Sequence, residues 1–307
     1  MKKDRILNIA KYAIILLIFF FIFRYLFQNF NSIKFSDLNF NIGFLLLSVL
    51  VYIVHILFNS VIWHVITVQN HCSVNLFESI KLRIYADFGR YIPGKVFAYG
   101  ILWFSYEKHK IPMKKIAVCS IQEFITTILA AVILSLFSIF ASDIKVLEPY
   151  KYIFLVLALG CFIFLYPPIL QLLMNIFFGI FKKEKIKLST TFGKIIITMI
   201  LFLLSWLVFG WAFYFFIISF YALPVHYYFF VTGAFAIATI IGAVSIFAPA
   251  GLGVREGVVI FTLSIIFTPV VSSIISLLSR LWMTLSEILL LVVVFIIDLI
   301  SKSRKNT

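Results

Sequence analysis

The sequence predicts an all-α polytopic integral membrane protein, and three observations support this prediction. Hydrophobic residues make up 63% of the 307 positions, against roughly half in an average soluble domain. Charged residues make up only 12%, and the mean hydropathy is +1.12. Nearly uncharged runs recur along the chain, many of them reaching the roughly 20 residues that a helix needs to cross a bilayer. This composition excludes a soluble cofactor-binding enzyme, a disordered chain and a disulfide-rich secreted domain.

The apolar runs predict about eight transmembrane helices. They lie at residues 9–28, 42–66, 116–140, 151–181, 194–221, 228–248, 256–268 and 271–299. We expect residues 1–307 to form a single membrane domain, divisible into halves 1–140 and 151–300, without a soluble domain.

The basic residues predict the orientation of these helices. Of the 26 Lys and Arg residues, 20 lie in segments that eight alternating spans place on the side of the N-terminus. The positive-inside rule therefore puts both termini in the cytoplasm. The same rule accounts for the net charge of +14 without a nucleic-acid partner. The widely spaced Cys72, Cys119 and Cys161 lack a metal-site or disulfide pattern, so we expect them to pack as inert residues and expect no metal or cofactor.

Two segments interrupt the apolar pattern, near residues 80–104 and 245–268. The first contains Pro93-Gly94, and proline ends a helix because it lacks a backbone donor and clashes with the preceding turn. This segment predicts a re-entrant hairpin, or alternatively an amphipathic helix on the inner leaflet. The second contains Pro249, Gly251 and Gly253. Paired broken helices in two halves of a chain are typical of the binding site of a transporter.

The glycines of the second segment also predict an anion site. They allow close backbone approach and leave the first amides of the next helix free for a ligand. Arg255 lies in the first turn of that helix, and it needs a partner there, such as Glu256 or an anionic ligand. The spacing of Gly-Leu-Gly-Val-Arg-Glu-Gly differs from a dinucleotide-binding fingerprint.

Ionisable residues within the predicted spans are costly and are therefore functional candidates. We expect an intramembrane charge network of Asp87, Glu123, Arg280 and Glu287. The candidate partners of Glu123 are Arg90, Lys95, Arg255 and Arg280. Arg280 and Glu287 share one helix face two turns apart, which is compatible with an ion pair that only fixes packing.

The two interrupted segments carry a family resemblance. Gly-Arg-Tyr-Ile-Pro-Gly-Lys-Val at 89–96 and Pro-Ala-Gly-Leu-Gly-Val-Arg-Glu-Gly at 249–257 resemble the lysylphosphatidylglycerol synthase transmembrane family, also called flippase-like membrane proteins. The resemblance covers roughly residues 10–300. It implies a lipid-headgroup site formed by the matching residues, which are Arg90, Pro93, Gly94, Lys95, Pro249, Gly251, Gly253, Arg255 and Glu256.

In longer members of this family, the multiple peptide resistance factors, such a region precedes an aminoacyltransferase domain. We expect no such domain in these 307 residues, so the resemblance implies the membrane fold and lipid handling, and not aminoacyl transfer. The expected function is therefore a lipid flippase of the bacterial cytoplasmic membrane, without enzymatic activity. It would move an anionic phospholipid or a polyprenyl-linked headgroup.

Two alternatives remain open at this point. The protein could be a non-transporting membrane partner of a separate synthase or glycosyltransferase, which would supply the chemistry. It could also be a membrane enzyme acting on a lipid phosphate, which would need paired carboxylates for a metal. The sequence is compatible with a homo-oligomer in each case.

Overall fold

The computed structural model describes residues 40–91, 97–142, 144–180, 190–245 and 251–306, and within these ranges the chain forms helices and no strands. Six helical segments of these ranges are long and apolar enough to cross a membrane, judged by length and composition. The prediction of an all-α polytopic membrane protein is therefore confirmed. The predicted span at 9–28 lies outside the described residues.

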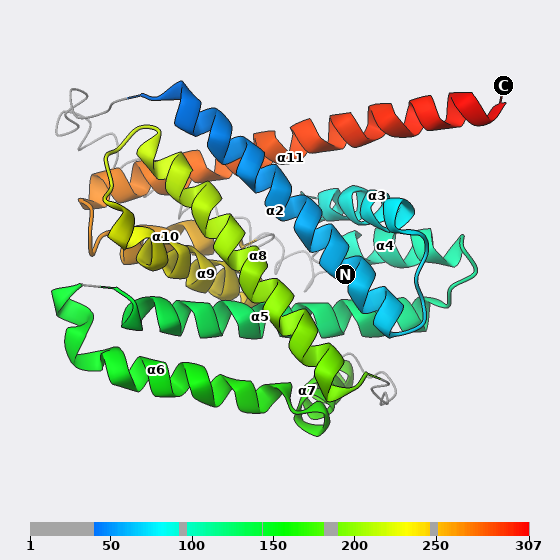
Figure 1. Cartoon of the computed structure of the whole chain (residues 1–307), viewed down its shortest axis with the longest axis horizontal. Coiled ribbons are helices and arrows are strands. Elements are labelled where there is room, and N and C mark those ends of the chain that lie inside the picture. The colour runs from blue at the N-terminus through cyan, green and yellow to red at the C-terminus, as the bar shows by residue number, and fades with distance from the viewer. Residues whose placement is uncertain (1–39, 92–96, 143, 181–189, 246–250, 307) are drawn as a thin grey trace, which may run out of the picture.

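Two long antiparallel helices, α2 (Ile42–Gln69) and α8 (Phe192–Ile218), pack side by side along their length (Figure 1). At one end, the backbone N–H of Asn41 donates to the carbonyl of Ser219 at 2.6 Å. At the other end, the side chain of Gln69 donates to the carbonyl of Lys194 at 3.2 Å. The side chain of Asn41 also caps α2 by accepting from the N–H of Phe44, which satisfies one of the free donors of the first turn.

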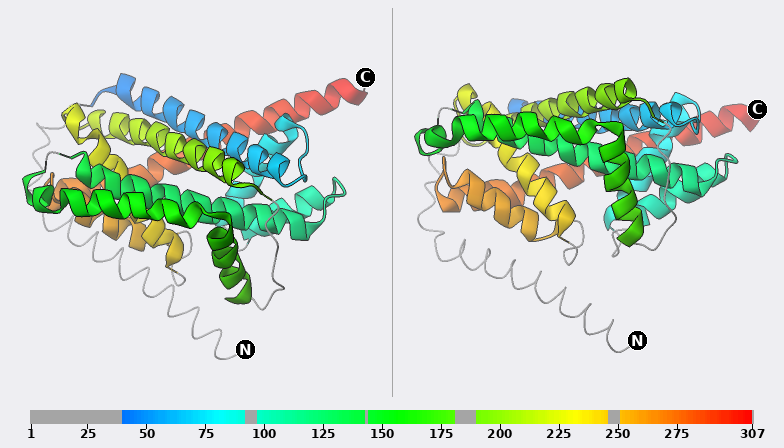
Figure 2. Two further views of the ribbon diagram at one scale, coloured as in Figure 1. Left: turned by 60° about the horizontal axis from the view of Figure 1, so that its bottom comes forward. Right: turned by 90° about the horizontal axis from the view of Figure 1, so that it is seen from below.

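The predicted span at 151–181 is wrong as a single helix. After α5 (Met113–Phe140), the chain forms a 3-10 turn (η4, Lys145–Tyr150), α6 (Lys151–Gly160) and a second 3-10 turn (η5, Cys161–Leu165). It then turns sharply into α7 (Pro167–Ile180), as Figure 2 shows. Tyr166 is extended, with φ −61° and ψ 124°, because the ring of a following proline disfavours the helical conformation.

The first interrupted segment is a helical hairpin. It consists of α3 (Leu76–Asp87), a 3-10 turn (η3, Phe88–Tyr91) and α4 (Phe97–Glu107), while Pro93-Gly94 lies outside the described residues. Both ends of the hairpin meet, because the hydroxyls of Ser79 and Tyr106 lie 2.9 Å apart. The two helices are close enough at the tip that a Cβ on Gly89 would lie 2.7 Å from the Cα of Ala98. The hairpin lies at what we call the α3–α4 end, where α2 ends and α5 begins (Figure 1).

The second interrupted segment is also a hairpin, made of α9 (Tyr228–Val244) and α10 (Val254–Leu263). Its two ends lie at the same end of the bundle, because the ring of Tyr221, which follows α8, contacts the ring of Phe267, which precedes the next helix, at 5.1 Å between centroids. We call this the α9–α10 end. The ten residues of α10 reach only about 15 Å. The predicted span at 256–268 is therefore too short to cross the bilayer as a single helix.

The last helix, α11 (Pro269–Asn306), runs from the α9–α10 end to the α3–α4 end and continues beyond the bundle (Figure 1). Near the far end of α11, Asp298 forms a salt bridge with Lys81 of α3 at 3.0 Å. The two hairpins thus enter the bundle from opposite ends, as both views in Figure 2 show. One hairpin falls in each of the predicted halves, although the division into halves stays a prediction.

Aromatic side chains from four helices fill the core between these ends. The indole of Trp282 on α11 stacks on Phe216 of α8 at 4.9 Å and contacts Tyr52 of α2 at 4.8 Å. Phe209 of α8 contacts Phe235 of α9 at 4.7 Å. This core holds α11 and α9 against the α2–α8 pair, and so fixes the side chains that those helices present to one another.

Candidate functional site

The first turn of α10 has a backbone that only glycine adopts readily. Gly251 and Gly253 have positive φ values of 69° and 81°, in the left-handed region that L side chains disfavour. A Cβ on Gly251 would also lie 3.0 Å from the Cα of Gly242 on α9. The Glu256 carboxylate accepts a hydrogen bond from the backbone N–H of Gly253 at 2.7 Å, which satisfies one of the free amides of the first turn.

Two arginines converge on this carboxylate. Glu256 is 1% exposed, and its Oε1 lies 3.4 Å from Nη2 of Arg255 and 3.2 Å from Nη1 of Arg280 on α11. The arginine side chains are 13% and 19% exposed. We call these three residues the α10 cluster. Because arginine stays protonated in proteins, the α10 cluster carries two positive charges and one negative charge.

The guanidinium of Arg255 also lies over an aromatic ring. Its Cζ is 5.3 Å from the ring centroid of Phe235 on α9, a cation–π contact that orients the side chain. Across the helices, the Ser276 hydroxyl of α11 donates to the backbone carbonyl of Glu256 at 3.1 Å. The α10 cluster is therefore held by contacts from α9, α10 and α11.

A second charged group lies at the first hairpin, and its arginine was missing from the sequence prediction. Arg83 of α3 contacts Glu123 of α5 at 2.6 Å and Asp87 at 3.2 Å, and its guanidinium lies over the ring of Trp63. We call Arg83, Asp87 and Glu123 the α3 cluster, which carries one positive and two negative charges.

The partner expected for Glu123 is thus corrected. The predicted partners were Arg90, Lys95, Arg255 and Arg280, whereas the observed ion pair is with Arg83. The i, i+4 spacing of Arg83 and Asp87 was a readable signal for an ion pair on one helix face. The contact with Glu123 was not readable, because it joins two helices whose packing a single sequence does not reveal.

The remaining predicted charge, Glu287, lies between Arg280 and Asp298 along α11. It is buried, and its Oε1 accepts a hydrogen bond from the Tyr52 hydroxyl of α2 at 2.8 Å. Arg280, seven residues earlier on the same helix, reaches Glu256 of α10. The two charges that share this helix face therefore contact different helices.

The structure brings together only part of the predicted headgroup site. Gly251, Gly253, Arg255 and Glu256 meet at the first turn of α10. Arg90 lies in the 3-10 turn after α3, and nothing is described of its side chain. Pro93, Gly94, Lys95 and Pro249 lie outside the described residues.

Two of the three cysteines meet, although they are far apart in sequence. The sulfurs of Cys72 and Cys119 lie 3.2 Å apart as free thiols in the interior. In the described ranges, no group of three or more His, Cys, Asp or Glu residues is placed to hold a metal ion.

Comparisons with known proteins agree with the motifs at the two hairpins. The family model of the lysylphosphatidylglycerol synthase TM region matches residues 8–291. Neither a search of curated proteins nor a search of solved structures finds a match. Membership of this family indicates a lipid-related function in a membrane. Since the match covers most of the sequence, the chain belongs to the lysylphosphatidylglycerol synthase transmembrane family.

Proposed function

We propose that this protein is a lipid translocator that binds the phosphate of an anionic phospholipid, or of a polyprenyl-linked headgroup, at the α10 cluster. It then moves this headgroup across the cytoplasmic membrane. Family membership supports a lipid as the substrate. The charge and the depth of the α10 cluster support the phosphate as the group that is recognised.

The α10 cluster lies deep in the bundle. Arg280 follows the start of α11 at Pro269 by 11 residues, which corresponds to about 16 Å along the helix. That is roughly half of the 30 Å hydrocarbon core. Charged side chains at this depth are costly, and hydrogen bonds to a bound phosphate would offset the cost of holding two arginines there. Arginine suits this role because its planar guanidinium donates two parallel hydrogen bonds to phosphate oxygens.

The arrangement of the hairpins supports transport rather than static binding. Broken helices that enter from opposite sides of the membrane are typical of transporters whose substrate site lies near the midplane. The α3 cluster on the other hairpin also lies deep, because Glu123 follows the start of α5 by ten residues, or about 15 Å. A headgroup that enters the bundle from either side of the membrane would therefore meet charged side chains of a hairpin.

The orientation belongs to the same proposal. Exposed lysines gather at the α3–α4 end, among them Lys108, Lys110, Lys114 and Lys115. The positive-inside rule places such an end in the cytoplasm. The α9–α10 hairpin would then enter from the outer face of the membrane.

The test compares wild type with Arg255→Met in liposomes that contain fluorescent phosphatidylglycerol. This substitution removes one cation and leaves the Glu256–Arg280 pair, so folding should persist. We expect lipid exchange to fall by roughly 10- to 100-fold, the loss of one hydrogen-bonded charged contact. The control, Lys108→Ala with Lys145→Ala, removes two exposed cations and should leave exchange unchanged.

Native mass spectrometry of the same preparations provides the second measurement. The proposal expects one class of anionic lipid to co-purify with wild type and to be lost from Arg255→Met. A non-transporting partner of a synthase would give bulk lipid in both proteins and no exchange in liposomes. That pair of results would overturn the proposal.

A further inference from the structure

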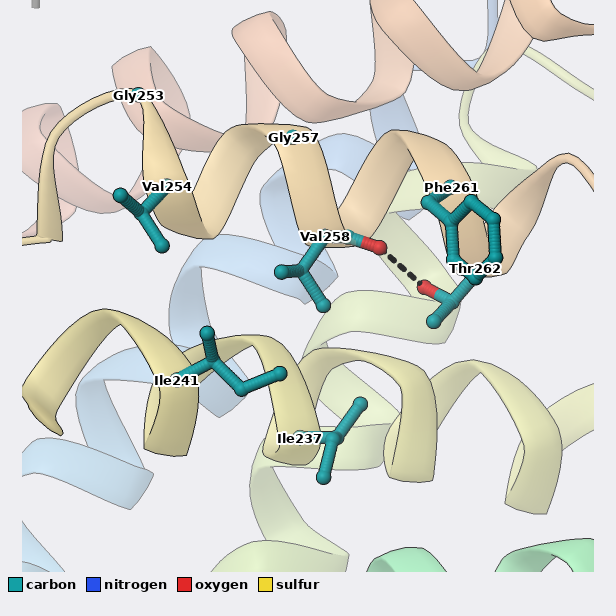
Figure 3. A pocket seen from close by; sticks show the side chains of 8 residues that line it. All are labelled: Ile237, Ile241, Gly253, Val254, Gly257, Val258, Phe261 and Thr262. Carbon is teal, nitrogen blue, oxygen red and sulfur yellow. Dashed lines mark hydrogen bonds between the residues drawn. The ribbon is translucent and has the colours of Figure 1, made fainter. Parts of the chain in front are cut away.

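An apolar groove runs along the outer face of the α9–α10 hairpin and has Gly253, a contact of the α10 cluster, among its lining residues. It has a volume of about 490 Å³ and lies between Ile237 and Ile241 of α9 and the outward face of α10 (Figure 3). Phe261 stands at its far end and is 77% exposed, while Ile241 is 41% exposed. The groove therefore opens sideways, toward the space that the bilayer would occupy.

The floor of the groove exists because α10 lacks side chains there. Gly253 and Gly257 lie one turn apart on this face. A Cβ on Gly257 would meet nothing within 4 Å, so among the described helices this glycine is not required for close packing. The one hydroxyl at the groove, on Thr262, is already bonded to the carbonyl of Val258 at 2.8 Å (Figure 3). The groove thus offers no side-chain donor to a polar ligand.

Gly253 connects this groove to the charged site. Its backbone N–H binds Glu256 of the α10 cluster, and its Cα side lines the groove. From Gly253 to Phe261 the groove follows eight residues of α10, or about 12 Å. If the phosphate of a lipid lies at the α10 cluster, an apolar groove that suits its acyl chain therefore begins next to the phosphate.

We propose that this groove binds one acyl chain of the lipid whose phosphate the α10 cluster holds, with the glycerol end of the chain at Gly253 and its methyl end at Phe261. The inference rests on the proposed function and adds the path of the lipid tail. A packed helix is the competing occupant, and a helix would not order the two ends of a lipid chain along α10.

The proposed direction of the chain differs from that of bulk lipid. In a free leaflet at the α9–α10 end, glycerol lies near the membrane surface and the terminal methyl near the midplane. In the groove the order is reversed, because the phosphate is held at mid-depth and the chain runs back toward the α9–α10 end. This reversal provides a readout that nonspecific lipid contact does not imitate.

The test uses purified protein in liposomes doped with phosphatidylglycerol that carries a diazirine either near the glycerol or near the terminal methyl. After photolysis, mass spectrometry locates the labelled residues. We expect the glycerol-proximal probe to label α10 near Val254 and the terminal probe to label it near Phe261. The exposed face of α6, from Tyr152 to Leu159, serves as the internal standard and should show the order of bulk lipid. The same order on α10 and α6 would overturn the proposal.

Two variants fill the groove from its two walls. Gly257→Leu fills it from α10, and Ile241→Trp fills it from α9, so that a folding defect in one still leaves the other. We expect labelling of α10 to fall about fourfold in each, which corresponds to losing the burial of roughly one methylene group. Gly193→Leu, at an exposed glycine of α8 with open space around it, should leave labelling unchanged. Unchanged labelling in a folded groove variant would also overturn the proposal.

Failure of this inference is distinguishable from failure of the proposed function. Loss of the proposed function would appear as absent lipid exchange by wild type, whatever the labelling pattern. Loss of the acyl groove would appear as bulk order on α10 while wild type still exchanges lipid and Arg255→Met does not.

Discussion

Arg280 Nη1 lies 3.2 Å from Glu256 Oε1 and so joins the middle of α11 to the first turn of α10. The same carboxylate binds the Gly253 amide and Arg255. A single buried side chain therefore links the tip of the hairpin to the long helix through charge, beside the hydrogen bond from Ser276 to the Glu256 carbonyl. Farther along, the Lys81–Asp298 salt bridge joins α11 to α3 of the other hairpin. The helix α11 thus contacts both hairpins through charged side chains.

Neutralising Glu256 should destabilise the protein. Glu256→Gln leaves Arg255 and Arg280 without their shared carboxylate, and breaking a buried ion pair from one side costs about 3–5 kcal/mol. Thermal unfolding in detergent measures the loss. Adding Arg280→Met to Glu256→Gln should recover part of it, because one unpaired cation is removed. This account would be contradicted if the double variant lost more stability than the two single variants lose in total.

Removing the central charge of the α3 cluster should also destabilise the protein. Here the central charge is a cation between two carboxylates, the reverse of the α10 cluster. Arg83→Met leaves the carboxylates of Asp87 and Glu123 unpaired, so we expect faster hydrogen exchange in α3 and a free energy of unfolding lower by about 3–5 kcal/mol. Glu123→Gln in the Arg83→Met background should restore much of the stability. Equal exchange rates in wild type and Arg83→Met would show that this ion pair does not hold the hairpin.

The contact between α9 and α10 leaves little space for a side chain at Gly242. A Cβ there would lie 3.2 Å from the Cβ of Arg255 and 3.5 Å from the Cα of Gly251. We expect Gly242→Val to cost about 1–3 kcal/mol through overpacking and to displace Arg255, which lowers lipid exchange. Gly100→Val is the matched control, because a Cβ on Gly100 meets nothing within 4 Å. Similar melting temperatures for the two variants would refute the close approach.

The Cys72 and Cys119 thiols should be convertible into a disulfide. Their sulfurs lie 3.2 Å apart, and a bond requires about 2.05 Å, so a small shift suffices. In a Cys161→Ser background, a membrane-permeant oxidant should remove two hydrogens from the protein mass and join the peptides that contain Cys72 and Cys119. Cys119→Ser should abolish the product. Failure to form the crosslink in folded protein would place the two sulfurs farther apart.

Much of the fold could be predicted because hydrophobicity is a local property. The predicted spans at 42–66 and 116–140 match α2 and α5 to within a few residues. The interruptions were also readable, since the glycines and prolines that break a helix are visible in the sequence. The errors arose where length was ambiguous. An apolar run at 256–268 looks the same in sequence whether the chain crosses the bilayer or turns back. The contact of Tyr221 with Phe267 shows that the chain turns back, because it brings the two ends of the α9–α10 hairpin together.

The sequence by itself determined the membrane class, the approximate spans and the two broken segments, and it singled out Arg255 and Glu256 as candidates. Only the tertiary structure decided which charges meet. Glu123 pairs with Arg83, 40 residues away, and Glu256 with Arg280, 24 residues away. It also revealed the groove beside Gly257. The physical reason is that apolar periodicity and helix breaks depend on neighbouring residues, whereas ion pairs and grooves depend on how separate helices pack.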